Sequence, residues 1–89
     1  MVQAHLLSAA GSAGTHTDAH LIQDLLWAYA HADHAVEHIR ARAVPHGVSL
    51  ALFVRAETEA VAADRAHGLL SNAEAPIGRL GYVVGPTSD

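Results

Sequence analysis

The first residues of the chain alternate between apolar and polar side chains, which is the pattern of a strand with one buried face. Within residues 2–8, Val2, Ala4 and Leu6 share one face, and the residues between them share the other. Small, turn-forming residues at 11–15 then predict a loop.

Beyond this loop, apolar residues recur every three or four positions, which predicts a helix with one buried side. The helix is expected to begin near Asp18, and Thr17 or Asp18 can cap it. Its apolar face comprises Leu21, Ile22, Leu25, Leu26 and Tyr29. The opposite face carries Trp27, the only tryptophan, with His20, Asp24, His31 and His34.

Two interpretations are open for the end of this helix. In the first, the helix ends at residues 32–34, and residues 36–44 form a strand. The outward face of that strand carries His38, Arg40 and Arg42. In the second, the helix continues to about Ala43, because alanine and arginine suit a helix better than a strand.

The residues that follow favour the first interpretation. Pro45, His46 and Gly47 are a tight-turn signal, since proline presets φ and glycine accepts a positive φ. Residues 48–55 are the clearest strand of the chain, because they are rich in branched and aromatic side chains. Such a strand needs neighbours, and the first interpretation places a hairpin partner immediately before it.

The second half of the chain predicts one more helix and one more strand. The helix spans residues 57–72, with Thr58 as a cap and acidic residues in the first turn. Residues 75–78, which include a proline and a glycine, end it. Residues 80–84 form a short last strand, which the Gly-Pro pair at 85–86 stops.

The resulting element order, β-α-β-β-α-β, predicts an α+β ferredoxin-like fold. That fold packs two helices on one face of a four-stranded antiparallel sheet, in strand order 4-1-3-2. With 89 residues, the chain has room for a single domain, expected at 1–86, with a disordered tail at 87–89. Since unrelated functions share this fold, the fold by itself does not imply a function.

Composition adds an expectation about assembly. Hydrophobic residues make up 51% of the chain, but many are alanines, and there is one Phe, one Trp and one Met. A core this thin in so short a chain is marginal alone, and oligomerisation is a usual remedy. We therefore expect a homo-oligomer, most simply a homodimer.

Charge and residue usage narrow the function classes. The net charge is −4 and there is no lysine, which argues against nucleic-acid binding. The absence of cysteine excludes disulfides, thiolate catalysis and cysteine-based metal sites. No apolar stretch approaches the roughly 20 residues needed to cross a bilayer. The first residues lack the basic start of a signal peptide, so we expect no membrane partner and a cytoplasmic location.

Eight histidines raise the question of a metal site. If the first helix were long, His31, His34 and His38 would share one face, and Asp24 could add an oxygen ligand. Imidazoles at that spacing can hold Zn²⁺ or Ni²⁺. If the helix ends early, His38 moves to a strand, and the other two are solvated residues at a helix end. We favour the second outcome and expect no cofactor.

Two surfaces are candidates for binding. Exposed Trp27 either forms an interface or is covered by the loop at 9–16 or by the C-terminal tail. The open face of the sheet combines apolar, aromatic and basic groups: Gln3, His5, Leu7, His38, Arg40, Arg42, Ser49, Ala51, Phe53 and Arg55. Its arginines can bind a carboxylate or a phosphate, and its apolar members can form a dimer contact, with Val83 beside them.

No nucleophile motif or complete phosphate-binding loop is present, so catalysis has little support. The sequence predicts a small interaction or accessory domain that acts as a homodimer or binds a partner protein. The interface residues expected are Trp27, Phe53, Arg40, Arg42, His38 and His5. Two alternatives stay open: a cofactor-free or metal-assisted enzyme with a histidine base, and a histidine-mediated metal- or pH-responsive module.

Overall fold

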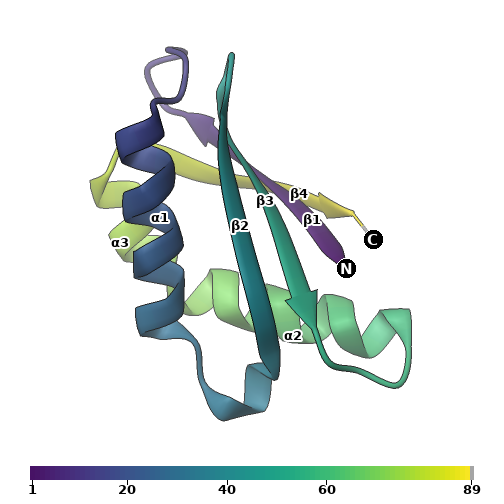
Figure 1. Cartoon of the computed structure of the whole chain (residues 1–89). Coiled ribbons are helices and arrows are strands. Elements are labelled where there is room, and N and C mark those ends of the chain that lie inside the picture. Colours follow the sequence, from purple (N-terminus) through teal and green to yellow (C-terminus); the bar gives the residue numbers. More distant parts are fainter. Residues whose placement is uncertain (89) are drawn as a thin grey trace.

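The four strands form one antiparallel sheet, and the helices cover one of its faces (Figure 1). A computed structural model describes the backbone of residues 1–88 and the side chains of residues 1–85. The strands are β1 (Val2–Ser8), β2 (Val36–Val44), β3 (Gly47–Val54) and β4 (Tyr82–Ser88). The helices are α1 (His16–Tyr29), α2 (Glu59–Asn72) and α3 (Glu74–Arg79), with a 3₁₀ turn, η1 (Ala32–His34). The sheet order β2-β3-β1-β4 confirms the predicted ferredoxin-like fold.

Both central strands bury one face, and in β1 this is the face that the alternating pattern assigned to the core. In β1 every second side chain is buried, beginning with Val2. In β3 the buried set is Val48, Leu50 and Leu52. These strands pair antiparallel with Leu6 opposite Val48, so the two buried faces form one apolar surface under the helices.

The first interpretation of the helix end is confirmed. Helix α1 ends at Tyr29, about three residues earlier than expected, and η1 connects it to β2. Strand β2 pairs with β3 from Val36 to Val44, so the hairpin decides against a long helix. Its inward side chain Ile39 is fully buried, whereas His38 lies on the outward face.

The start and the buried face of α1 differ from the prediction. The cap is Thr15, whose Oγ1 accepts a 3.0 Å hydrogen bond from the backbone N–H of Asp18, so neither predicted cap residue has this role. Leu21 and Tyr29 are 47% and 37% exposed, although the apolar spacing assigned both to the core. The face of α1 that is buried against the sheet consists of Ala19, Ile22 and Leu26. Beside it, Gln23 Oε1 accepts a 3.2 Å hydrogen bond from the N–H of Ala41.

The second large helix begins two residues later than predicted, with the predicted cap. Thr58 Oγ1 accepts a 3.1 Å hydrogen bond from the N–H of Val61. The segment expected only to end α2 forms α3 instead. Pro76 is tolerated there because it lies in the first turn, where a helical N–H has no intrahelical acceptor.

The last strand is longer than predicted. Strand β4 begins at Tyr82 and continues through Pro86 to Ser88, pairing with β1 across an irregularity between Ala4 and Leu6. As an edge strand, β4 accommodates a residue without an N–H donor, so the Gly-Pro pair does not stop it. The predicted disordered tail therefore begins inside β4, and Asp89 lies outside the described residues.

Helices cover only one side of the sheet, and between the two layers lies the core. Its largest fully buried side chains are Leu6, Ile22, Leu26, Ile39, Leu50, Leu52, Leu69, Leu70 and Ile77. Within the part of the chain that the structure describes, no helix combines the length and the apolar character needed to cross a membrane. None of the described helices lies on the opposite face of the sheet.

Candidate functional site

The open face of the sheet is built of cross-strand rows, and the row at one end is apolar. It runs across all four strands, because Val44 lies opposite Gly47, Gly47 opposite Leu7, and Leu7 opposite Val83. Leu7 and Val83 are 47% and 56% exposed, the highest values for large aliphatic residues among the described side chains of the strands. Two neighbouring apolar side chains are thus presented to solvent on a face without a helix.

The two rows in the middle of the open face are polar and basic. In one, Arg42 lies opposite Ser49, and Ser49 lies opposite His5. In the other, Arg40 lies opposite Ala51, and Ala51 lies opposite Gln3. The small β3 residues leave a hollow of about 340 Å³ over these rows, lined by Met1, Gln3, Arg40, Ala41, Arg42, Ser49, Leu50, Ala51 and Phe53.

Neither arginine of this hollow has a charged partner among the described side chains. Arg40 and Arg42 are exposed and make no ion pair or side-chain hydrogen bond with any side chain that the structure describes. No Asp or Glu whose side chain the structure describes lines the hollow. Although the whole chain is acidic, this part of the open face is therefore positively charged.

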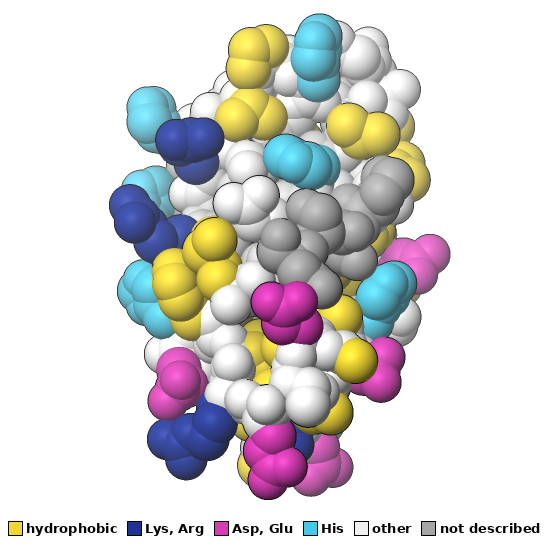
Figure 2. All heavy atoms as spheres, turned by 90° about the vertical axis from the view of Figure 1, so that its right-hand side faces the viewer, with side chains coloured by type: hydrophobic (Ala, Val, Ile, Leu, Met, Phe, Trp, Pro, Cys, Tyr) yellow, Lys and Arg dark blue, Asp and Glu magenta, His cyan; other side chains and the backbone are white. Residues whose placement is uncertain are grey.

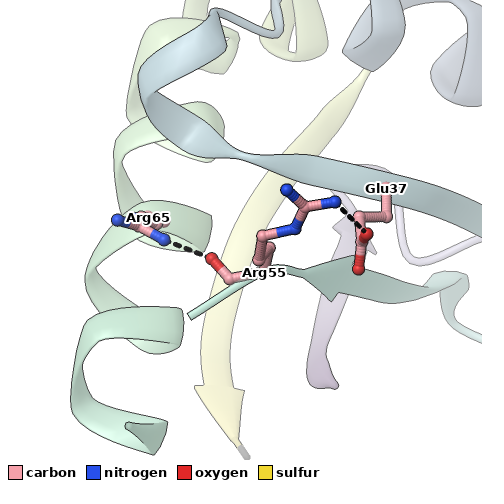
Figure 3. A network of polar contacts seen from close by, with 3 residues as sticks. All are labelled: Glu37, Arg55 and Arg65. Atoms are coloured by element: carbon pink, nitrogen blue, oxygen red, sulfur yellow. Dashed lines mark hydrogen bonds and ion pairs between the residues drawn. The ribbon is translucent and has the colours of Figure 1, made fainter. Parts of the chain in front are cut away.

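The far end of the open face is aromatic and then charged. The rings of His38 and Phe53 lie 5.6 Å apart between centroids, tilted by 48°. Beyond them, the guanidinium of Arg55 forms a 3.1 Å ion pair with Glu37, and the carbonyl oxygen of Arg55 accepts a hydrogen bond from Arg65 (Figure 3). Because Arg55 pairs with Glu37, two of the three arginines predicted on this face, Arg40 and Arg42, are left to bind an anion.

Figure 2 shows the molecule from the right-hand side of Figure 1. Arginine and histidine side chains gather along its left border, with hydrophobic side chains next to them. Strand β2 carries three basic residues on its outward face: His38, Arg40 and Arg42. The basic groups are therefore concentrated along one edge strand rather than spread over the sheet.

The three histidines proposed as metal ligands are not brought together. His34 Nδ1 accepts a 3.0 Å hydrogen bond from the backbone N–H of His31, and its ring packs on Gly68 of α2, where an added Cβ would lie 3.3 Å from it. His38 is on the outward face of β2 beside Phe53. The rings of His31 and His34 lie 5.4 Å apart between centroids, but the early end of α1 leaves His38 elsewhere. In the described residues, no three His, Asp or Glu side chains are grouped to hold a metal ion.

Trp27 belongs to a different surface from the other predicted interface residues. It is 42% exposed on α1, in the helical layer, whereas His5, His38 and Phe53 lie on the open face of the sheet. The loop proposed as its cover folds instead toward the β2–β3 turn, where the N–H of Gly14 donates to the carbonyl of Val44 at 3.0 Å. The predicted set therefore divides into two surfaces.

One member of the apolar row was missed from the sequence. Val44 shares the outward face of β2 with His38, Arg40 and Arg42, and the alternation within residues 36–44 was the signal that could have placed it there. The hollow itself could not be predicted, because it depends on which β3 residues lie opposite the arginines. Comparisons of this chain with protein-family models, with curated proteins and with solved structures found no match.

Proposed function

We propose that this protein is a small interaction domain that associates with a second copy of itself through the apolar row of its open sheet face. The observation that carries the proposal is the pairing of Leu7 with Val83, both about half exposed, on a face that no helix covers. Contiguous exposed apolar patches on a protein surface often mark interaction sites.

The distribution of charge supports a second copy as the partner. In a twofold dimer the same patch meets itself, so a suitable patch must be apolar or self-complementary. Val44, in the apolar row, is two residues from Arg42 along β2, which corresponds to about 7 Å. A contact centred on Leu7 and Val83 therefore lets the apolar rows meet while the arginine pairs of the two copies stay apart.

The thin core gives the association an energetic reason. Several fully buried core residues are alanines, among them Ala4, Ala66 and Ala73, and each contributes little buried area. Complete burial of an aliphatic side chain contributes about 1.5–3 kcal/mol. Burial of Leu7 and Val83 in each copy adds apolar area that the small monomer lacks.

Sedimentation velocity over a range of concentrations tests the proposal with two matched variants. Val83→Lys places a charge in the apolar row, and Val61→Lys makes the same change at an exposed valine of α2. We expect the wild type and Val61→Lys to dimerise and Val83→Lys to sediment as a folded monomer.

A wild type that is monomeric at every concentration would contradict the proposal. A second contradiction would be a dimer that persists in Val83→Lys and is lost in Trp27→Ala, because the interface would then lie on the helical layer. Circular dichroism of each variant establishes that a change in mass is not a loss of fold.

A further inference from the structure

We propose that the hollow between β2 and β3 on the open face binds a small aromatic carboxylate. In this site Arg40 and Arg42 hold the carboxylate group, and the ring of the ligand lies against Phe53. The hollow measures about 340 Å³ and combines cationic, polar and apolar lining residues. This volume lies at the lower end of the range of small-molecule sites, about 300–1,000 Å³.

The arrangement of charges is the first argument for an anion. The chain has nine Asp and Glu residues and five arginines, so acidic partners are in excess. Arg55 pairs with Glu37, and Arg65 donates to the carbonyl of Arg55. Arg40 and Arg42, in contrast, have no partner among the described side chains, and both line the same hollow. Their positive charge is left for a ligand.

The strand geometry is the second argument, and it favours a carboxylate held between the two arginines. Arg40 and Arg42 project from the same face of β2 and are spaced by two residues, about 7 Å along the strand. Their cross-strand neighbours, Ala51 and Ser49, are small, so the guanidinium groups can reach over β3. A planar guanidinium binds a carboxylate through two parallel hydrogen bonds, and Ser49 and Gln3 add polar groups on the far side.

The apolar part of the hollow is the third argument, and it favours an aromatic body over a bare inorganic anion. Phe53 is two residues from Ala51 on the same face of β3, and Met1 lies across from it in the lining. The ring of His38 lies 5.6 Å from that of Phe53 between centroids. Inorganic phosphate would bind the arginines but make no contact with Phe53, whereas an aromatic carboxylate would contact the arginines and Phe53.

The site is separate from the surface proposed for self-association. The hollow and the apolar row share no residue. On β1 the hollow includes Gln3 and the row includes Leu7, about 13 Å farther along, whereas on β2 Arg42 and Val44 are about 7 Å apart. A ligand in the hollow therefore does not depend on a dimer, and each proposal can fail without the other.

To test the proposal, the full chain is titrated in low salt with benzoate, benzamide or inorganic phosphate. Binding is measured by NMR from the changes in the amide chemical shifts. Benzamide is the neutral counterpart of benzoate. We expect saturable shifts with benzoate at the hollow, none with benzamide and weaker binding of phosphate. Arg40→Gln and Arg42→Gln should each weaken benzoate binding about tenfold, as expected for loss of a hydrogen bond between charged groups.

Three further variants make the result decisive. Arg79→Gln removes an exposed arginine outside the hollow and should leave benzoate binding unchanged. Phe53→Ala should weaken benzoate binding but not phosphate binding. Val83→Lys should bind benzoate like the wild type, whatever its oligomeric state.

The proposal is overturned if benzoate does not saturate, or if benzamide binds equally well. It is also overturned if phosphate binds as tightly as benzoate and Phe53→Ala affects neither ligand, since the hollow would then take inorganic anions. An equal loss in Arg79→Gln would show general charge attraction instead of a site. Loss of benzoate binding in folded Val83→Lys would contradict the separation of the two surfaces.

Discussion

The Tyr82 hydroxyl donates a 2.6 Å hydrogen bond to Oδ2 of Asp18, and so joins the start of β4 to the first turn of α1. Tyr82 is 5% exposed, and its partner lies 64 positions away in the chain. The bond to Asp18 is the main cause that raises the pKa of Tyr82 to about 12, followed by burial and by the negative charge of Asp18.

Tyr82→Phe should lower the free energy of unfolding by about 1–2 kcal/mol, because the variant loses a hydrogen bond to a carboxylate and keeps the buried ring. Urea denaturation measures the change. The matched control is Tyr29→Phe, whose ring is 37% exposed and which should change stability by less than about 0.5 kcal/mol. Equal effects of the two substitutions would show that the Tyr82 bond contributes nothing specific.

The same bond predicts a dependence of stability on high pH. A tyrosine in the unfolded chain has a pKa of about 10, and the folded value is raised to about 12. The stabilisation is therefore complete below about pH 10 and is lost as the pH rises from there through the folded pKa. The stability gap between wild type and Tyr82→Phe should be constant up to about pH 10 and shrink above it. A gap that stays unchanged at pH 12 would refute this linkage.

The two helix caps, Thr15 of α1 and Thr58 of α2, can be tested by substitution. Thr15→Ala and Thr58→Ala each remove a side-chain acceptor from a helix start, and each should cost about 1 kcal/mol of stability in thermal or urea unfolding. Thr17→Ala is the control, because Thr17 lies inside α1 and alanine is the better helix former. A larger loss for Thr17→Ala than for Thr15→Ala would place the cap at the position that the sequence predicted.

The close approach of Gly14 to the β2–β3 turn predicts a strict requirement for glycine. An added Cβ at Gly14 would lie 1.9 Å from the carbonyl oxygen of Gly47, a backbone atom that cannot move alone. Gly14→Ala should therefore destabilise the protein by about 1–3 kcal/mol or more. Gly78→Ala, where an added Cβ meets nothing within 4 Å, should be neutral or slightly stabilising. The melting temperatures of the two variants test this prediction. Similar values for Gly14→Ala and Gly78→Ala would contradict the close approach at Gly14.

Substitution of His34 tests whether this histidine stabilises the fold or binds a metal ion. His34→Ala removes the acceptor for the His31 N–H and the contact with Gly68, and should cost about 1 kcal/mol of stability. Calorimetric titration of Zn²⁺ should show equal, weak binding to the wild type and to the His31→Ala/His34→Ala variant. Zinc binding that is strong in the wild type and absent from the double variant would restore the metal hypothesis.

Local sequence determined most of the strands and the helix α2. The alternation in residues 2–8 and the apolar run after Pro45 depend only on near neighbours, because burial of one strand face repeats every second residue. Thr58 was recognisable as a cap for the same reason: its hydrogen bond reaches three residues along the chain. Element order then sufficed for the sheet topology, and the outward positions of Arg40, Arg42 and Phe53 followed from the strand period.

Tertiary contacts decided the rest. The end of α1 depended on the pairing of β2 with β3, and the orientation of α1 depended on the packing of Ile22 and Leu26 into the core. Strand β4 passes Pro86 because it is at the edge of the sheet, where the missing donor costs no ladder bond. The hollow exists because small residues of β3 lie opposite the arginines of β2. Each of these features joins segments distant in the chain or depends on a strand's place in the sheet, which a pattern of near neighbours does not contain.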